Sequence, residues 1–148
     1  MQMPPLDPAI LARRSEIVAA LRAIVPGEGV IDDLDGMRPY ECDALSAYRQ
    51  MPLVVVLPET VDQVSAIIKR AALVAYPRSE VASLSGAAWA AFVTARSGRE
   101  GEAPTMRRLL SNACDPHQQP NAADLRSLID EAKRWVFTHP AEAVAEAS

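Results

Sequence analysis

Leu-Val-Val-Val-Leu, residues 53–57, is the stretch that decides the fold of this chain. Pro52 and Pro58 bound the run on either side, and neither proline can donate a hydrogen bond to a neighbouring strand. A run this short and this rich in β-branched valine is typical of a buried strand rather than a helix. The sequence therefore predicts one strand at Leu53–Leu57, although it does not say which segment pairs with it.

A helix follows this strand after a short turn. Thr60 and Gln63 have the spacing of a capping box, in which a threonine hydroxyl and a glutamine side chain satisfy the first amides of a helix. Apolar residues then recur at helical spacing at Val61, Val64, Ile67 and Ile68. The pattern is strand, turn, helix.

The two ends of the chain also predict helices. Asp7 is placed to cap a first helix over about Pro8–Val25, with Pro8 at its first position. Its apolar stripe is Ile10, Leu11, Ile17, Val18, Leu21 and Ile24. Asn121 is placed to cap the last helix, which His139 and Pro140 close. The apolar positions of that helix are Leu125, Leu128, Ile129, Ala132, Trp135 and Val136.

Between these ends the helical pattern is shorter or absent. Residues 28–52 have no period, and Asp32, Asp33 and Asp35 there lack the spacing of a calcium-binding EF-hand loop. A short helix is predicted at Thr105–Ser111, between loops at 97–104 and 112–120. The fold class that follows is α+β, mostly helical, with one short strand–helix unit.

Three quoted stretches carry a resemblance to a known family: Leu21–Ile31, Arg38–Gln50 and Met51–Val64. Residues of about 10–68 resemble the N-terminal segment of the FAD-linked subunit of bacterial glycolate oxidase, in the family with the vanillyl-alcohol-oxidase (PCMH) type of FAD-binding domain. The resemblance implies a partial edge of such a domain, FAD as hydride acceptor and a small 2-hydroxy acid such as glycolate as substrate. The catalytic residues of that family lie beyond the matched part, so no catalytic residue is assigned here.

That family continues into a glycine-rich loop around the FAD pyrophosphate, because backbone amides reach a diphosphate only where side chains do not crowd the approach. Here the corresponding stretch is Arg78–Ala88, and the weak candidates for FAD contact are Arg78, Ser83, Ser85 and Gly86. Ser79, Val81 and Ser83 stand in place of the loop glycines. The interpretation we favour is a helix capped by Ser79, with Val81, Leu84, Ala88 and Phe92 on one stripe and Trp89 and Val93 beside it. FAD is therefore expected by resemblance only.

The residues Lys69–Phe92, followed by Leu109-Leu110 and the apolar positions of the last helix, carry a second resemblance. Residues of about 69–139 are similar to an uncharacterised bacterial family encoded beside MoxR-type AAA ATPases and von Willebrand factor A proteins. Members of that family usually carry an N-terminal transmembrane helix. The two resemblances together predict a fusion with its seam near 67–70: residues 1–68 from a truncated oxidase, and residues 69–148 as a small helical domain with a frayed tail.

Composition limits the remaining classes of function. The formal net charge is −4 and the sequence pI is about 5.2, so a nucleic-acid-binding surface is not expected. No apolar run approaches the ~18 residues of a membrane span, and a cytoplasmic location is the expectation. Cys42 and Cys114 are too few and too far apart to predict a disulfide framework or a zinc site, and no metal site is assigned.

Three hypotheses about function remain open. The chain is a fragment of a FAD-linked oxidase that is inactive alone, a non-catalytic helical protein that docks a MoxR or von Willebrand factor A partner, or a fusion with no evolved role. Four aromatic residues are the anchors for a docking surface: Trp89, Phe92, Trp135 and Phe137. Packing inside a small helical core is the favoured alternative for the same side chains.

Overall fold

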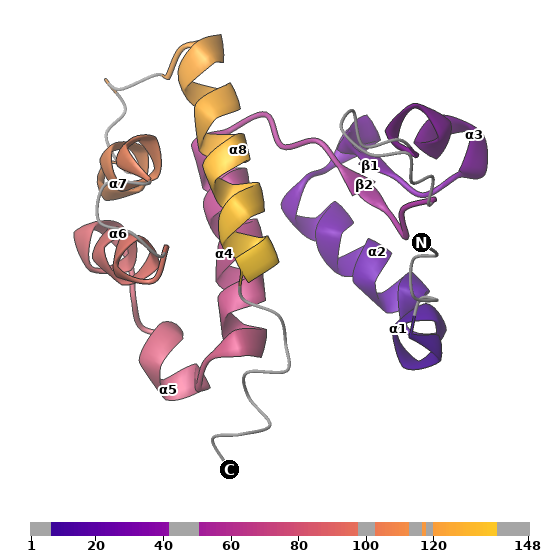
Figure 1. Ribbon diagram of the computed structural model, residues 1–148, viewed down its shortest axis with the longest axis horizontal. Coiled ribbons are helices and arrows are strands. Elements are labelled where there is room, and N and C mark those ends of the chain that lie inside the picture. The colour runs from indigo at the N-terminus through magenta and orange to yellow at the C-terminus, as the bar shows by residue number, and fades with distance from the viewer. Residues whose placement is uncertain (1–6, 42–50, 98–102, 113–116, 118–119, 139–148) are drawn as a thin grey trace. The chain divides into compact units, whose positions relative to one another are not determined.

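The computed structural model divides the chain into two compact units, Met1–Pro58 and Glu59–Ser148 (Figure 1). It describes residues 7–41, 51–97, 103–112, 117 and 120–138, and of Phe137 and Thr138 only the backbone. The described part is mostly helical with one small sheet, which confirms the predicted α+β class. Cys42, Cys114 and His139 lie outside the described residues.

The first unit begins with two consecutive helices, α1 (Pro8–Ala12) and α2 (Arg14–Ile24). Asp7 caps α1 as predicted, since its carboxylate accepts a hydrogen bond from the Ala9 amide at 2.9 Å. The single predicted helix is interrupted at Arg13, which is the C-cap of α1 and the N-cap of α2. The two helices also differ in burial, since Val18 in α2 is buried whereas Ile10 in α1 is 45% exposed.

The predicted strand is shorter than its apolar run, and it pairs with a segment that the sequence did not indicate. β1 (Val30–Ile31) and β2 (Val55–Val56) form an antiparallel pair in which Val30 faces Val56 and Ile31 faces Val55. A hydrogen bond of 2.7 Å from the Leu57 amide to the Gly29 carbonyl extends the pairing. The short helices η1 (Gly27–Gly29), α3 (Leu34–Met37) and η2 (Arg38–Tyr40) flank β1.

Two arginines of α2 fasten this small sheet to the helix: Arg22 pairs with the Asp32 carboxylate at 2.7 Å, and Arg14 reaches both strands. The Arg14 guanidinium on α2 donates through Nε to the Leu53 carbonyl at 3.1 Å and through a terminal nitrogen to the Asp32 carbonyl. These carbonyls lie just before β2 and just after β1. A two-stranded ribbon is marginal by itself in water, so an anchor to both strands contributes disproportionately to its stability.

Arg14→Met is therefore expected to loosen the sheet while leaving α2 intact. We expect the Leu57 amide to exchange with solvent at least about tenfold faster, because loss of charge-assisted hydrogen bonds costs more than ~1.4 kcal/mol. Hydrogen exchange followed by NMR measures this directly. The matched control is Arg13→Met, since the neighbouring arginine is exposed and pairs with the exposed Glu16 at 3.0 Å; equal exchange in both variants would contradict the anchoring role.

The second unit begins with α4 (Val61–Ala75). The Thr60 hydroxyl accepts from the Gln63 amide at 3.2 Å, as the capping-box pattern predicts. The Gln63 side chain reaches back to the Glu59 amide at 2.7 Å, one residue before the cap. Helix α4 runs without interruption across the predicted seam at 67–70, and the boundary between the two units lies between Pro58 and Glu59.

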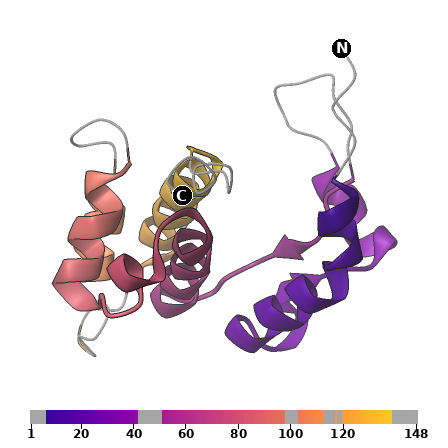
Figure 2. The same ribbon diagram turned by 90° about the horizontal axis from the view of Figure 1, so that it is seen from below.

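The other helices of this unit are α5 (Arg78–Val81), α6 (Gly86–Ala95), α7 (Pro104–Ser111) and α8 (Ala122–Thr138). Helices α4 and α8 pack side by side, and α6 and α7 form a second pair that crosses them (Figure 2). The core between the pairs is continuous. Its largest fully buried side chains are Trp135, Ile68, Met106, Leu110, Leu128, Val81 and Val93.

Two local predictions for this unit have opposite outcomes. Asn121 caps α8 as expected, accepting from the Asp124 amide at 2.8 Å. The continuous helix starting at Ser79 is wrong, because α5 begins at Arg78 and ends at Val81, and α6 begins only at Gly86. The residues between are a turn, and Gly86 has a φ of +52°, a conformation that favours glycine.

Candidate functional site

The stretch that aligns with a FAD loop, Arg78–Ala88, packs against α4. Lys69 of α4 donates its ammonium group to the Leu84 carbonyl at 2.6 Å, and the same ammonium lies 5.7 Å from the centre of the Trp89 ring. The Trp89 indole in turn donates to the Ser65 hydroxyl at 3.0 Å. The end of this turn and the start of α6 are therefore fastened to one face of α4.

The four residues predicted as weak FAD contacts lie along this α5–turn–α6 segment. Arg78, Ser83 and Ser85 are exposed and Gly86 is half-buried. Glu80 is ion-paired with Arg96 at 3.8 Å, so its charge is directed towards α6. Open space surrounds the position that a side chain would occupy at Gly86. Their role towards FAD stays a prediction.

The aromatic residues predicted as docking anchors are mostly core residues. Trp89 and Trp135 are 3% and 1% exposed, and Phe92 is half-buried against them. The Phe92 ring stacks on Trp89 at a centroid distance of 5.8 Å and meets the edge of Tyr76 at 5.3 Å. The side chain of Phe137 lies outside the described residues. Trp89 and Trp135 therefore pack inside the helical core, as the favoured alternative predicts. Neither side chain is available to contact a partner.

One charged side chain completes this aromatic cluster. The Arg96 guanidinium lies 3.8 Å from the Phe92 ring centre and 5.0 Å from that of Tyr76. Burial raises the pKa of the Tyr76 phenol above its ordinary value of 10.0, and the nearby Arg96 charge partly opposes this. The packing of the neutral phenol therefore contributes fully to the free energy of unfolding below pH 10. This contribution is lost as the pH rises through the folded-state pKa.

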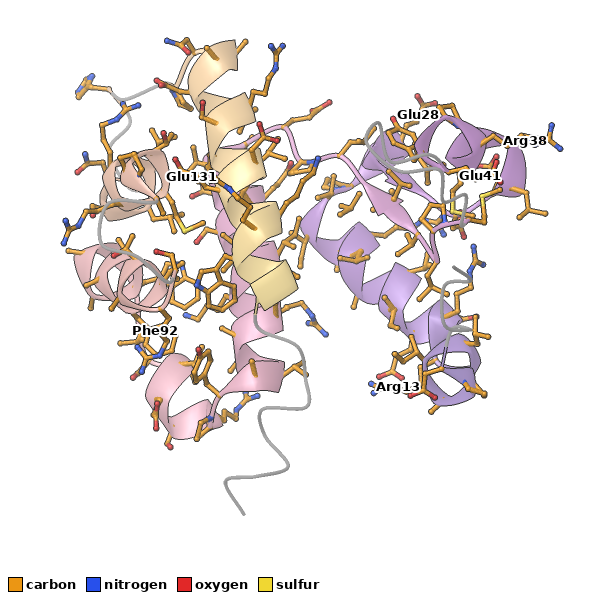
Figure 3. The ribbon with its side chains drawn as sticks, viewed as in Figure 1. Arg13, Glu28, Arg38, Glu41, Phe92 and Glu131 are labelled. Carbon is orange, nitrogen blue, oxygen red and sulfur yellow. The ribbon has the colours of Figure 1, made fainter. Side chains whose placement is uncertain are left out.

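A buried carboxylate joins α8 to α7. Glu131, the buried charged residue of the core, accepts hydrogen bonds from the Met106 amide at 2.6 Å and from the Thr105 amide at 3.3 Å (Figure 3). These are the first free amides of α7, whose own N-cap Ala103 has no side-chain acceptor. A glutamate from a distant helix therefore does what a serine or aspartate cap does locally.

A hollow of about 1070 Å³ lies between α6 and α7, half open to solvent. Its lining is mainly small or polar, with two adjacent arginines: Ala91, Thr94, Ala95, Ser97, Ala103, Pro104, Arg107, Arg108, Ser111 and Asn112. The linear sequence does not reveal this groove, because the alanines of α6 and the Arg107-Arg108 pair come together only when the two helices pack.

In the described residues, no group of three or more histidine, cysteine, aspartate or glutamate side chains is placed to hold a metal ion. Among the helices that the structure describes, none combines the length and the apolar character needed to cross a bilayer.

Comparison with curated proteins supports the oxidase resemblance over a short segment. The chain is 49% identical over 55 residues to the "Glycolate oxidase subunit GlcD" of Escherichia coli (strain K12) and, to the same extent, to that of E. coli O6:H1 (strain CFT073). The match covers 37% of this chain and 11% of each relative. The chain thus spans only a small part of the length of these relatives. No solved structure matches it.

Comparison with family models gives a longer match. The model described as "Domain of unknown function (DUF4381)" matches residues 43–138. The match includes β2 and every helix from α4 to α8, which is the whole described part of the second unit. It extends well over half of the chain, and the protein therefore belongs to the DUF4381 family.

Proposed function

We propose that this protein is a non-catalytic, helical protein-binding module of the DUF4381 family, joined to an N-terminal segment derived from a FAD-linked oxidase. The oxidase segment supplies a small α+β unit and no oxidase chemistry of its own. The helical unit supplies the surface that a partner recognises.

One observation carries this proposal: the hydrogen bond from Lys69 to the Leu84 carbonyl. A diphosphate site needs free amides on an uncrowded backbone. Here the turn is held by the ammonium group of Lys69, which is bound to the Leu84 carbonyl, and the turn links two helices of a packed core. The segment is better suited to holding α6 in place than to receiving FAD.

The proposed partner is a MoxR-type ATPase or a von Willebrand factor A protein, as the resemblance of residues 69–139 implies. Support for a protein partner comes from the surface of the second unit, where the α6–α7 groove is open although the aromatic side chains are inside. The experiment is a pull-down of purified MoxR-type and von Willebrand factor A proteins from the source genome by the full chain. Retention of either supports the proposal, and retention of neither contradicts this choice of partner.

The second candidate, a flavoprotein fragment, is favoured by the 49% identity to GlcD over 55 residues. On our proposal, the purified chain mixed with excess FAD and then desalted retains no flavin absorbance, and added glycolate reduces no acceptor dye. A full-length FAD-linked oxidase is the positive control. Flavin retained at equal stoichiometry with quenched fluorescence would contradict the proposal and return Arg78–Ala88 to the role of a cofactor loop.

A further inference from the structure

The α6–α7 groove has a floor made of small side chains. Ala91 and Ala95 line it from α6, and Ala103 and Pro104 line it at the start of α7. Ala103 is buried, whereas Ala91 and Ala95 are exposed. Side chains of this size let the backbone of an incoming segment approach closely, which is the usual requirement for a helix packed in a groove between two helices.

Two hydroxyl groups that line the groove already donate hydrogen bonds to backbone carbonyls. The Thr94 hydroxyl donates to the Ala90 carbonyl at 2.8 Å, and the Ser111 hydroxyl donates to the Arg107 carbonyl at 2.7 Å. Each hydroxyl bonds within its own helix. The charged donors that line the groove are the guanidinium groups of Arg107 and Arg108.

The two arginines at the rim differ in their partners. Arg108 is paired with Asp124 of α8 at 2.7 Å. Arg107 is exposed, and its guanidinium has no acidic partner among the residues that the structure describes. One positive charge at the edge of an alanine-floored groove is thus available to a carboxylate.

We propose that this groove docks an amphipathic helix from a protein partner, with small apolar residues against Ala91 and Ala95 and a carboxylate against Arg107. The inference deepens the proposed function by naming the class of partner. Phosphate-rich ligands fit less well, since they need several converging cations and the chain as a whole has a net charge of −4.

The test uses two synthetic, fluorescein-labelled helical peptides that share one alanine-rich apolar face. One has glutamate on its polar face and the other has lysine. Fluorescence anisotropy with the full chain is expected to show binding of the glutamate peptide, weakened at high salt, and at least about tenfold weaker binding of the lysine peptide.

Two substitutions with matched controls locate the binding. Arg107→Glu is expected to weaken glutamate-peptide binding about tenfold, whereas Arg126→Glu, an exposed arginine outside the groove, leaves it within about twofold. Ala91→Phe fills the groove and is expected to abolish binding, whereas Ala88→Phe, exposed on the same helix outside the lining, does not. Unchanged circular dichroism confirms that each variant is folded.

Several outcomes would overturn this inference: equal affinity for both peptides, no affinity for either, or equal effects of Ala91→Phe and Ala88→Phe. A chain that forms dimers in sedimentation velocity, with dimers lost in Ala91→Phe, would also overturn it and assign the groove to a second copy. Failure here is distinguishable from failure of the proposed function, because the pull-down can still retain a partner in the Ala91→Phe variant.

Discussion

Replacing Trp135 by alanine is expected to lower the free energy of unfolding of the Glu59–Ser148 unit by ~3–5 kcal/mol. The Trp135 side chain is 1% exposed, so its removal leaves a large cavity between the crossing helix pairs. Its indole nitrogen also donates to the Val93 carbonyl at 3.0 Å, in a buried hydrogen bond that joins α8 to α6. Alanine removes both the packing and the indole donor, although the Val93 carbonyl keeps its hydrogen bond from the Arg96 amide at 3.2 Å.

The measurement is urea unfolding followed by far-ultraviolet circular dichroism, with Trp89 fluorescence as a second probe. Both tryptophans of the chain lie in this unit, so fluorescence reports on it without a contribution from residues 1–58. Trp135→Phe is the matched control, because it keeps most of the ring and loses the N–H, and we expect a loss of ~1–2 kcal/mol. A loss under 1 kcal/mol for Trp135→Ala would show that the indole does not hold α8 against α6.

The parts of the fold that sequence predicts well are those determined by neighbours along the chain. The caps at Asp7, Thr60 and Asn121 form as expected, because a cap depends on a side chain and an amide two or three residues away. Most of the predicted apolar stripe of α8 is likewise correct, with Leu128 and Trp135 among the most buried residues, whereas its last member, Val136, is 40% exposed. In each of these cases the geometry of a few neighbouring residues is sufficient to predict the element.

The parts that sequence misses depend on contacts between distant segments. The helix predicted from Ser79 is broken before Gly86, where Lys69 binds the Leu84 carbonyl in a contact across 15 positions that no local propensity contains. The partner of β2 is a two-residue strand at Val30–Ile31, within a stretch without hydrophobic period. A strand this short gives too little pattern to detect, and its pairing is fixed by Arg14 from a third element.

The candidate sites show the same difference between features that depend on neighbouring residues and features that depend on distant contacts. Aromatic residues at helical spacing were compatible with either a core or a docking face, and only burial distinguishes the two for Trp89 and Trp135. The α6–α7 groove requires two helices to meet, so its alanines and arginines carry no visible signal in the linear sequence. The oxidase resemblance, in contrast, is readable from sequence because it rests on identity over one continuous segment.

The tertiary cap made by Glu131 leads to the second large effect. Glu131→Ala is expected to lower the free energy of unfolding of the same unit by ~2–4 kcal/mol, because hydrogen bonds to a charged acceptor are stronger than neutral ones and two amides lose their partner. Those amides, of Thr105 and Met106, begin a helix that has no local side-chain cap. The carboxylate also complements the positive end of the α7 dipole.

Urea unfolding followed by tryptophan fluorescence checks this, together with hydrogen exchange at the Met106 amide, which is expected to lose its protection first. Glu131→Gln keeps an oxygen acceptor without the charge, and it is expected to recover about half of the loss. Asp130→Ala is the matched control: its side chain is exposed one position earlier on α8, and its effect is expected within ~0.5 kcal/mol. Equal stability of Glu131→Ala and Asp130→Ala would mean that α7 is held by its apolar face alone. A larger loss in Glu131→Ala, with early exchange confined to α7, would instead show that one glutamate on α8 sets the position of the helix that carries the arginines of the groove.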